Sequence, residues 1–242
     1  MPLALEFQSV RKSFGAHEVL KDISFAIDEG EAVGLVGING SGKTTLIHGL
    51  LDLNRIDAGT ISIFGTPHTE TQARDQLSYL AERFSPPYFA TGVELLRYLS
   101  ALHGEDYDPR AAEREAQALG LSGEVLSLPA RQYSKGMAQK LGLVACILPG
   151  RPLLVLDEPM SGLDPRARTL FKHRLFELKN HGVTIFFSTH LLVDVESLCD
   201  RLVVIHDGTV RYAGTPDDLM ASHHCRVLED AFLHCIEDGA ED

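Results

Sequence analysis

The sequence predicts an α/β fold built around a phosphate-binding loop, and three features predict it. A short apolar segment, residues 31–36, leads into a glycine-rich loop at 37–45. The segments 153–156 and 183–187 are continuously apolar, as expected for strands that are buried on both faces of a parallel sheet. The 242 residues are enough for one domain with an inserted lobe.

The N-terminal region is expected to consist of strands that lead into the loop. Apolar residues alternate with smaller or polar residues over 3–7 and 23–27, which indicates strands with one buried face. After the loop we expect an apolar helix to about Leu53 and then a strand at 61–64.

Residues 85–149 predict helices. Thr91 and Glu94 have the spacing of a capping box, in which each side chain accepts a hydrogen bond from the other residue's backbone. Asp108 precedes a proline, which is the pattern of an N-cap before the first helical position. Ser134 is expected to cap the next helix, which ends near residue 149.

The α/β pattern returns after residue 150. Asp164-Pro165 starts a helix, strands are expected near 201–206 and 209–214, and two short helices close the chain. The expected organisation is a core at about 1–84 and 150–214, a helical lobe at about 85–149 and a helical tail at 215–242.

The glycine-rich loop fits the pattern G-x-x-x-x-G-K-[ST], which binds nucleotide phosphates. Its glycines let backbone N–H groups approach an anion, and the following helix directs its positive N-terminus to the same place. Lys43 is expected to reach the β- and γ-phosphates of ATP, and the Thr44 hydroxyl to bind Mg²⁺. The residues expected to bind the nucleotide here are Gly37, Ile38, Asn39, Gly40, Ser41, Gly42, Lys43, Thr44 and Thr45.

Two carboxylates follow the apolar strand at 153–156. Because ligands of open α/β sheets gather at the carboxyl ends of the strands, Asp157 and Glu158 are expected beside the loop. Asp157 is expected to hold Mg²⁺, and Glu158 is placed to accept a proton from a water that attacks the γ-phosphate. The alternative is an acidic pair that only caps a helix.

Further motifs follow in an order that resembles the ATP-binding cassette (ABC) ATPases. Tyr133-Ser134-Lys135-Gly136-Met137 is similar to their signature motif, Ser161-Gly162-Leu163-Asp164 to their D-loop and Ser188-Thr189-His190 to their H-loop. Phe14 matches the aromatic residue that stacks on adenine, and Glu82 takes the place of the Q-loop glutamine. The ordered combination is far more specific than any one of these motifs.

The resemblance implies a P-loop NTPase core with an N-terminal antiparallel β subdomain and an inserted α-helical subdomain. It also implies a head-to-tail dimer, in which each ATP lies between the P-loop of one copy and Ser134 and Gly136 of the other. In that arrangement Asp164 couples the two sites, and His190 hydrogen-bonds the γ-phosphate and helps to hold the attacking water. The alternative for His190 is a strand-end histidine satisfied by backbone. The second cassette can be an identical or a different chain.

Two positions depart from the family pattern. Glu82 stands where the family usually has glutamine; its carboxylate can still reach Mg²⁺ or its waters, but it adds negative charge. The signature has Lys135 in place of a glycine and Met137 in place of a glutamine. This variant resembles the one common among small exporter-type cassettes.

Composition restricts the partners. The formal net charge of −12 disfavours nucleic acid, because phosphate contacts need clustered Lys and Arg. No apolar stretch approaches the ~20 residues that span a bilayer, and the N-terminus lacks the features of a signal peptide. We therefore expect a cytoplasmic chain that attaches to the cytoplasmic face of a membrane through a separate permease subunit.

The apolar, aromatic segment 84–89 favours such a partner. In similar cassettes this region resembles the groove that receives a coupling helix of a membrane subunit. The alternative is that these side chains pack inside the helical lobe. Two other functions stay open: a soluble cassette ATPase that acts in assembly or maintenance, and a nucleotide-gated binding module without turnover.

Overall fold

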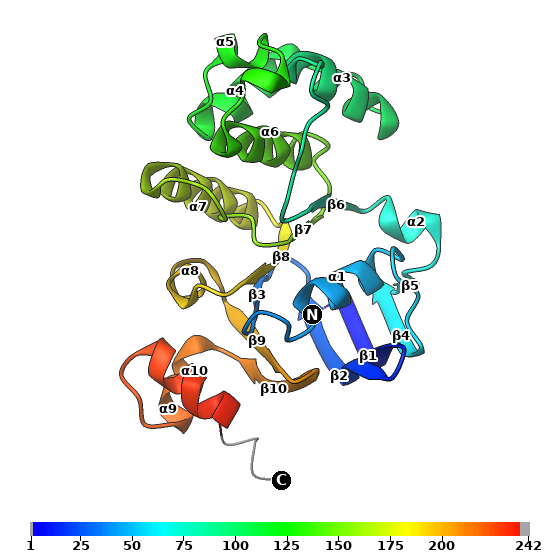
Figure 1. The fold of residues 1–242 in the computed structure, drawn as a ribbon, viewed down its shortest axis with the longest axis vertical. Coiled ribbons are helices and arrows are strands. Elements are labelled where there is room, and N and C mark those ends of the chain that lie inside the picture. The colour runs from blue at the N-terminus through cyan, green and yellow to red at the C-terminus, as the bar shows by residue number, and fades with distance from the viewer. Residues whose placement is uncertain (1, 238–242) are drawn as a thin grey trace.

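The computed structural model describes residues 2–237, which form two sheets flanked by helices (Figure 1). A six-stranded sheet has the order β10-β9-β3-β8-β7-β6, in which neighbouring strands run parallel except for the antiparallel β10. Its strands are β3 (Ala32–Val36), β6 (Leu77–Leu80), β7 (Leu153–Leu156), β8 (Thr184–Thr189), β9 (Arg201–His206) and β10 (Thr209–Gly214).

A four-stranded antiparallel sheet has the order β2-β1-β4-β5 and stands beside the first. Its strands are β1 (Leu3–Phe14), β2 (His17–Asp28), β4 (Ala58–Ile63) and β5 (Thr66–Pro67). The helices are α1 (Lys43–Leu50), α2 (Thr71–Arg74), α3 (Gly92–Leu102), α4 (Pro109–Ala118), α5 (Gly123–Leu126), the 3-10 turn η1 (Ala130–Gln132), α6 (Lys135–Ile147), α7 (Pro165–Asn180), α8 (Leu192–Leu198), α9 (Pro216–Ser222) and α10 (Leu228–Glu237).

The predicted fold class is confirmed: a parallel α/β core carries an antiparallel β region and a helical lobe formed by α3 to α6 (Figure 1). The exact division of the chain into core, lobe and tail stays a prediction. No helix within residues 2–237 is long and apolar enough to cross a membrane.

Apolar cores hold these layers together. Between the sheets, the Phe7 and Phe25 rings stack with centroids 4.5 Å apart, and each lies 6.1 Å from the ring of Phe186 on β8. The apolar side of α1 completes this core. On the other face of the six-stranded sheet, the buried Phe171 of α7 and Phe187 of β8 belong to a core that also includes α6.

The predicted helix caps are confirmed. Thr91 and Glu94 form both hydrogen bonds of the capping box at the start of α3. The N-cap side chains of α4, α6, α7 and α9 likewise accept hydrogen bonds from backbone N–H groups of the first turn; these caps are Asp108, Ser134, Asp164 and Thr215. Polar residues at these positions therefore satisfy N–H groups that the helices leave without an internal partner.

The first helix is shorter than the sequence suggests. We expected it to reach about Leu53, but α1 ends at Leu50. Asp52 adopts a left-handed φ of 58°, which turns the chain away from the helix axis, and Leu53 is exposed. The chain was also not expected to form strand β6, which pairs along β7 at the edge of the sheet.

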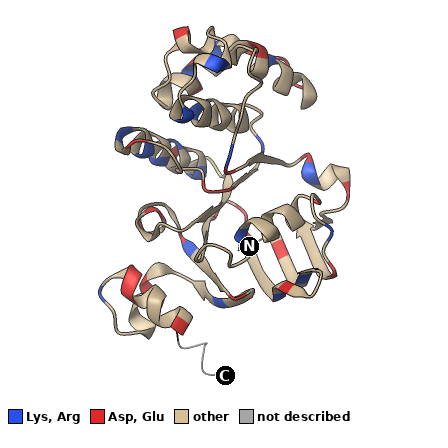
Figure 2. Ribbon diagram, viewed as in Figure 1, with Lys and Arg blue, Asp and Glu red and all other residues tan. Residues whose placement is uncertain are grey.

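Basic residues gather on α7, as Figure 2 shows. Three of them are engaged by carboxylates of other elements. Lys172 pairs with Asp194, Arg174 with Glu115 and Lys179 with Asp200. These ion pairs tie α7 to its neighbours.

Candidate nucleotide-binding site

The loop between β3 and α1 has the geometry of a phosphate cradle. Gly40 and Gly42 have φ angles of 85° and 107°, a conformation that residues with a side chain rarely adopt. A Cβ atom on Gly37 would lie 2.4 Å from the carbonyl oxygen of Ile205, so this position also needs glycine. The loop then delivers its N–H groups to the N-terminus of α1, where the helix dipole favours an anion.

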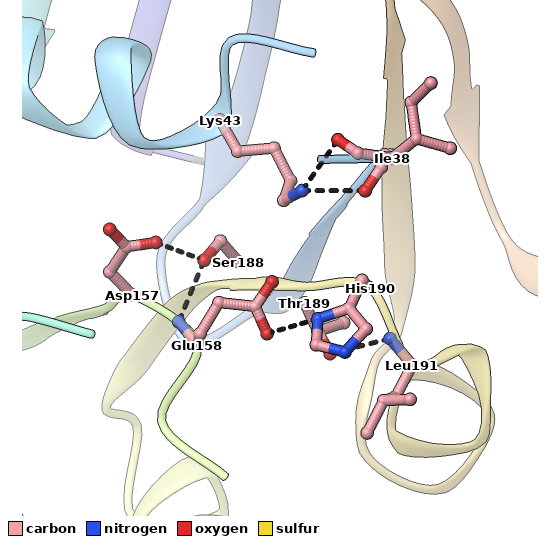
Figure 3. A network of polar contacts seen from close by, with 9 residues as sticks. Ile38, Lys43, Asp157, Glu158, Ser188, Thr189, His190 and Leu191 are labelled. Carbon is pink, nitrogen blue, oxygen red and sulfur yellow. Dashed lines mark hydrogen bonds and ion pairs between the residues drawn. The ribbon is translucent and has the colours of Figure 1, made fainter. Parts of the chain in front are cut away.

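Lys43, the first residue of α1, lies inside this loop. Its side chain is buried, and its Nζ donates hydrogen bonds to the carbonyl oxygens of Gly37 at 2.7 Å and Ile38 at 3.2 Å (Figure 3). Burial lowers the pKa of Lys43, while the nearby carboxylates of Glu158, Asp157 and Glu82 act in the opposite direction. The loop thus holds one desolvated cation opposite three acidic side chains.

A serine connects the two acidic residues that follow β7. The Ser188 hydroxyl, at the end of β8, donates to Oδ1 of Asp157 at 2.5 Å and accepts from the backbone N–H of Glu158 at 2.9 Å (Figure 3). Glu158 has a left-handed φ of 45°, which is costly for a residue with a side chain and is common at functional sites. Ser188 therefore holds Glu158 in a strained conformation and fixes the buried Asp157 carboxylate.

His190 faces Glu158 from the next strand. Its Nδ1 lies 2.9 Å from Oε2 of Glu158 (Figure 3). Because an ionised carboxylate only accepts hydrogen bonds, this contact assigns the proton to Nδ1 of the imidazole. The turn after His190 is closed by the N–H of Leu191, which donates to Oγ1 of Thr189 at 3.0 Å. About half of the His190 side chain is exposed, so the ring stands at the mouth of the site.

These groups surround one open cavity of about 340 Å³. Its lining residues are Val19, Asn39, Gly40, Gly42, Lys43, Thr44, Thr45, Glu82, Glu158, Ser161 and His190. The cavity therefore brings together the phosphate loop, the predicted base, the H-loop histidine and the Q-loop carboxylate. Gly37, Ile38, Ser41 and Asp157 do not line it; Gly37 and Ile38 contact Lys43 and Asp157 contacts Ser188 behind the lining.

Four further residues expected to bind nucleotide, which lie outside the phosphate loop, also do not line this cavity. Phe14 lies at the end of β1, half exposed, with the Lys12 ammonium 5.1 Å from its ring centroid. Ser134 caps α6 in the helical lobe, and Gly136 lies in the first turn of the same helix. Asp164 caps α7, where the N–H of Ala167 donates to its carboxylate and holds its pKa low.

The residues that reasoning from sequence missed are Ser188, Val19 and Ser161. Ser188 was assigned only to a motif, although a hydroxyl residue at the end of a buried strand beside two carboxylates is a signal for a hydrogen-bonding role. Ser161 belongs to the predicted D-loop, and its position in the cavity follows from the sharp turn at Glu158. Val19 comes from β2, and no sequence pattern points to it.

The donors around the cavity suit Mg²⁺. The Thr44 hydroxyl and the carboxylates of Glu82 and Asp157 are hard oxygen ligands, which this ion prefers. No group of three His, Cys, Asp or Glu side chains within residues 2–237 is arranged to hold a metal alone. Mg²⁺ is usually bound through one or two carboxylates together with the phosphates of a nucleotide.

Comparison with known proteins gives a consistent result. A family model described as ABC transporter matches residues 20–161. An uncharacterized ABC transporter ATP-binding protein of Synechocystis sp. is 36% identical over 208 residues, covering 85% of this chain and 59% of the relative. The Nod factor export ATP-binding protein I of Burkholderia lata is 35% identical, covering 95% of this chain and 77% of that protein. The chain thus spans about three fifths of the first of these relatives.

Solved structures share the fold. A structure described as the ATP-binding subunit of an ABC transporter has a TM-score of 0.87 and 33% identity, covering 96% of this chain and 99% of that one. A dimeric bacterial ABC transporter cassette has a TM-score of 0.80 and 19% identity, covering 87% and 98% of the two chains. At that identity the second comparison shows the fold alone.

Ser188→Ala is expected to lower ATP turnover at least about tenfold. The variant removes the hydrogen-bond donor to the Asp157 carboxylate and the acceptor for the backbone N–H of Glu158, and leaving such a buried group unsatisfied costs about 1–3 kcal/mol. ATP binding through the loop should change little. Phosphate release and equilibrium binding of ATP measure the two effects.

Ser78→Ala is the matched control, since Ser78 is also a buried serine of the same sheet but its hydroxyl has no hydrogen-bond partner within the described residues. Equal turnover in the Ser188 variant, the Ser78 variant and the unmodified protein would contradict the role given to Ser188.

Proposed function

Because the chain belongs to the ATP-binding cassette (ABC) transporter family, we propose that it binds and hydrolyses ATP to power a membrane transporter. The observation that carries this proposal is the cavity in which Lys43, Thr44, Glu158 and His190 meet. A cradle for phosphates, a base and a polar group near the mouth are the parts that phosphoryl transfer to water requires.

The hydrolysis step assigns a role to each side chain. Lys43 exchanges the carbonyl oxygens of Gly37 and Ile38 for oxygens of the β- and γ-phosphates. Glu158 accepts a proton from a water that attacks the γ-phosphorus, and the bond to the oxygen bridging to the β-phosphate breaks, which leaves ADP and phosphate. His190, held by Glu158, orients that water and contacts the γ-phosphate.

Thr44, Asp157 and Glu82 would hold Mg²⁺, and the bound ion would supply positive charge that offsets the charge of the triphosphate. Phe14 stacks on the adenine at the edge of the site, where half of its side chain is exposed. The adenine thus lies outside the phosphate cavity, on the β1 side.

A second cassette completes the site. Ser134 is exposed at the N-terminus of α6, and neither it nor Gly136 lines the cavity of its own chain. The α6 N-terminus combines N–H groups, a dipole and a hydroxyl, which suit a γ-phosphate. We therefore assign this helix end and Asp164 to the nucleotide site of a head-to-tail partner, a second copy or a related chain.

The helical lobe offers a surface for a membrane subunit. Tyr88, Phe89, Tyr98 and Leu102 are each more than 60% exposed on or beside α3, an unusual concentration of apolar side chains in the described surface. A small cavity lies next to them between β6, α3 and α6, and it is partly lined by Phe84. The proposed occupant is a cytoplasmic segment of a separate permease, which would place the chain on the cytoplasmic face of the membrane.

Export is the proposed direction. The signature variant with Lys135 and Met137 resembles exporter-type cassettes, and one relative is described as a Nod factor export protein. The transported compound is selected by the membrane subunit.

Glu158→Gln is expected to reduce turnover about 100-fold or more, because the amide keeps the size of the side chain but cannot accept the proton. ATP binding should persist in this variant and be lost in Lys43→Ala. Phosphate release and fluorescence titration with an ATP analogue measure both. Full turnover in Glu158→Gln would contradict the role of Glu158 as the base. Unaltered ATP binding in Lys43→Ala would contradict the assignment of the P-loop.

Ser134→Arg is expected to block ATP-driven dimerisation, because the larger cation fills the place of the γ-phosphate. The mass in solution with ATP, measured by light scattering in a Glu158→Gln background, tests this. Ser122→Arg is the control, since Ser122 is an exposed N-cap in the same lobe that makes no side-chain cap bond. A dimer in the Ser134 variant would count against the sandwich.

Phe89→Asp is expected to release the chain from a polytopic membrane protein with which the unmodified chain copurifies, while basal ATP turnover is kept. Phe176→Asp serves as the control, because Phe176 is also exposed but lies on α7. If no membrane protein copurifies, or if both variants stay bound, the permease surface is wrongly placed and the soluble ATPase becomes the better account.

A further inference from the structure

A buried ion pair joins α7 to α8 away from the cavity. The Asp194 side chain is 2% exposed, and its Oδ1 lies 2.6 Å from Nζ of Lys172. The same ammonium donates to the carbonyl oxygen of Val193 at 3.4 Å. The second oxygen, Oδ2, has no hydrogen-bond partner within the described residues. Since a buried carboxylate is costly without a cation, Asp194 depends on Lys172.

The two residues of the pair lie on helices that begin at segments of the candidate site. Asp194 lies four residues after His190, in the first turn of α8. Lys172 lies eight residues after Asp164, about two turns into α7. In Figure 1 the two helices lie on the same side of the six-stranded sheet. Each helix thus extends directly from one segment of the candidate site.

These connections form a closed ring. One side runs from Glu158 through Ser161 and Asp164 into α7, and the other runs from Ser188 through His190 into α8. Two contacts join the two sides. At the site, Nδ1 of His190 lies 2.9 Å from Oε2 of Glu158, and between the helices Lys172 pairs with Asp194. A ring with two fixed points leaves little freedom for the His190 side chain to leave Glu158.

Stability alone does not explain a charged pair in this place. A buried salt bridge is often no better for stability than well-packed apolar residues, but it accepts only one geometry. The apolar cores on both sides of the pair already include Phe171, Leu175, Val195 and Leu198. The pair therefore contributes more to the relative position of α7 and α8 than to the stability of the fold.

We infer that Lys172 and Asp194 are positioning residues for hydrolysis: they fix the distance between the D-loop helix and the H-loop helix, so that His190 stays on Glu158. This inference rests on the proposed ATPase function. The pair would then connect the D-loop, which faces a second cassette in that proposal, to His190 through α7 and α8.

Lys172→Met tests the inference, with Lys179→Met as the matched control. Lys179 also lies on α7 and pairs with an aspartate, but its partner, Asp200, follows the far end of α8. We expect Lys172→Met to lower kcat about tenfold with KM for ATP within twofold, and Lys172→Arg and Lys179→Met to keep at least half of kcat. Measurements are made well below the unfolding temperature of every variant.

Amide hydrogen exchange provides a readout that needs no turnover. Lys172→Met should raise exchange several-fold over residues 189–195, and Lys179→Met should not. Equal exchange and equal kinetics in the two variants would overturn the inference and leave the pair a structural contact. Absence of turnover in the unmodified protein would instead refute the proposed function, while the exchange result would still decide whether the pair fixes His190.

Discussion

The parallel pairing of β3, β8 and β7 is the constraint on which the site depends. Val36 lies opposite Thr189, and Leu156 lies opposite Phe187, so the three strands end at the same edge of the sheet. The phosphate loop, His190 and the acidic pair follow these ends directly. A slip of one residue in either pairing would turn every side chain of the slipped strand to the opposite face, so the assembled site depends on this register.

The loops after the carboxyl ends of these strands also contain features that are locally unfavourable. Lys43 is desolvated, Asp157 is buried and Glu158 has a left-handed backbone. Each feature costs free energy, and each is held by contacts that the rigid strands provide. The Ser188 hydroxyl shows this most directly, because one atom from β8 holds both acidic residues that follow β7. These two acidic residues are therefore held in place before any phosphate arrives, and groups that are fixed in advance avoid reorganisation during the reaction.

Sequence reasoning predicted the fold class and most of the cavity, because these depend on local patterns. The glycines of the loop, the polar caps such as Asp164 and the continuous apolar strand before Asp157 are each determined by a few neighbouring residues. What it missed depends on tertiary contacts. The edge strand β6 is only four residues long and gains its identity by pairing with β7, and Val19 reaches the cavity from a different sheet.

The early end of α1 and the pair of Lys172 with Asp194 could not be predicted for related reasons. A left-handed residue such as Asp52 leaves no pattern in a short apolar run. Lys172 belongs to a basic helix, and helical spacing does not reveal which neighbouring element covers a given residue. In the structure, Asp194 provides that neighbour from α8, which begins at Leu192, 20 residues after Lys172.

Electrostatic interactions would make the proposed dimer depend on bound ATP. Each chain carries a formal charge of −12, and the cavity sets Lys43 against three carboxylates, so two empty copies have no electrostatic reason to associate. Bulk repulsion is screened beyond about 8–10 Å at physiological salt, whereas contacts at the interface are not. In the proposed dimer, a triphosphate held by one loop would present negative oxygens at short range to the α6 N-terminus of the other copy. Short-range attraction then opposes the repulsion only while the γ-phosphate remains, which is why hydrolysis would separate the two cassettes.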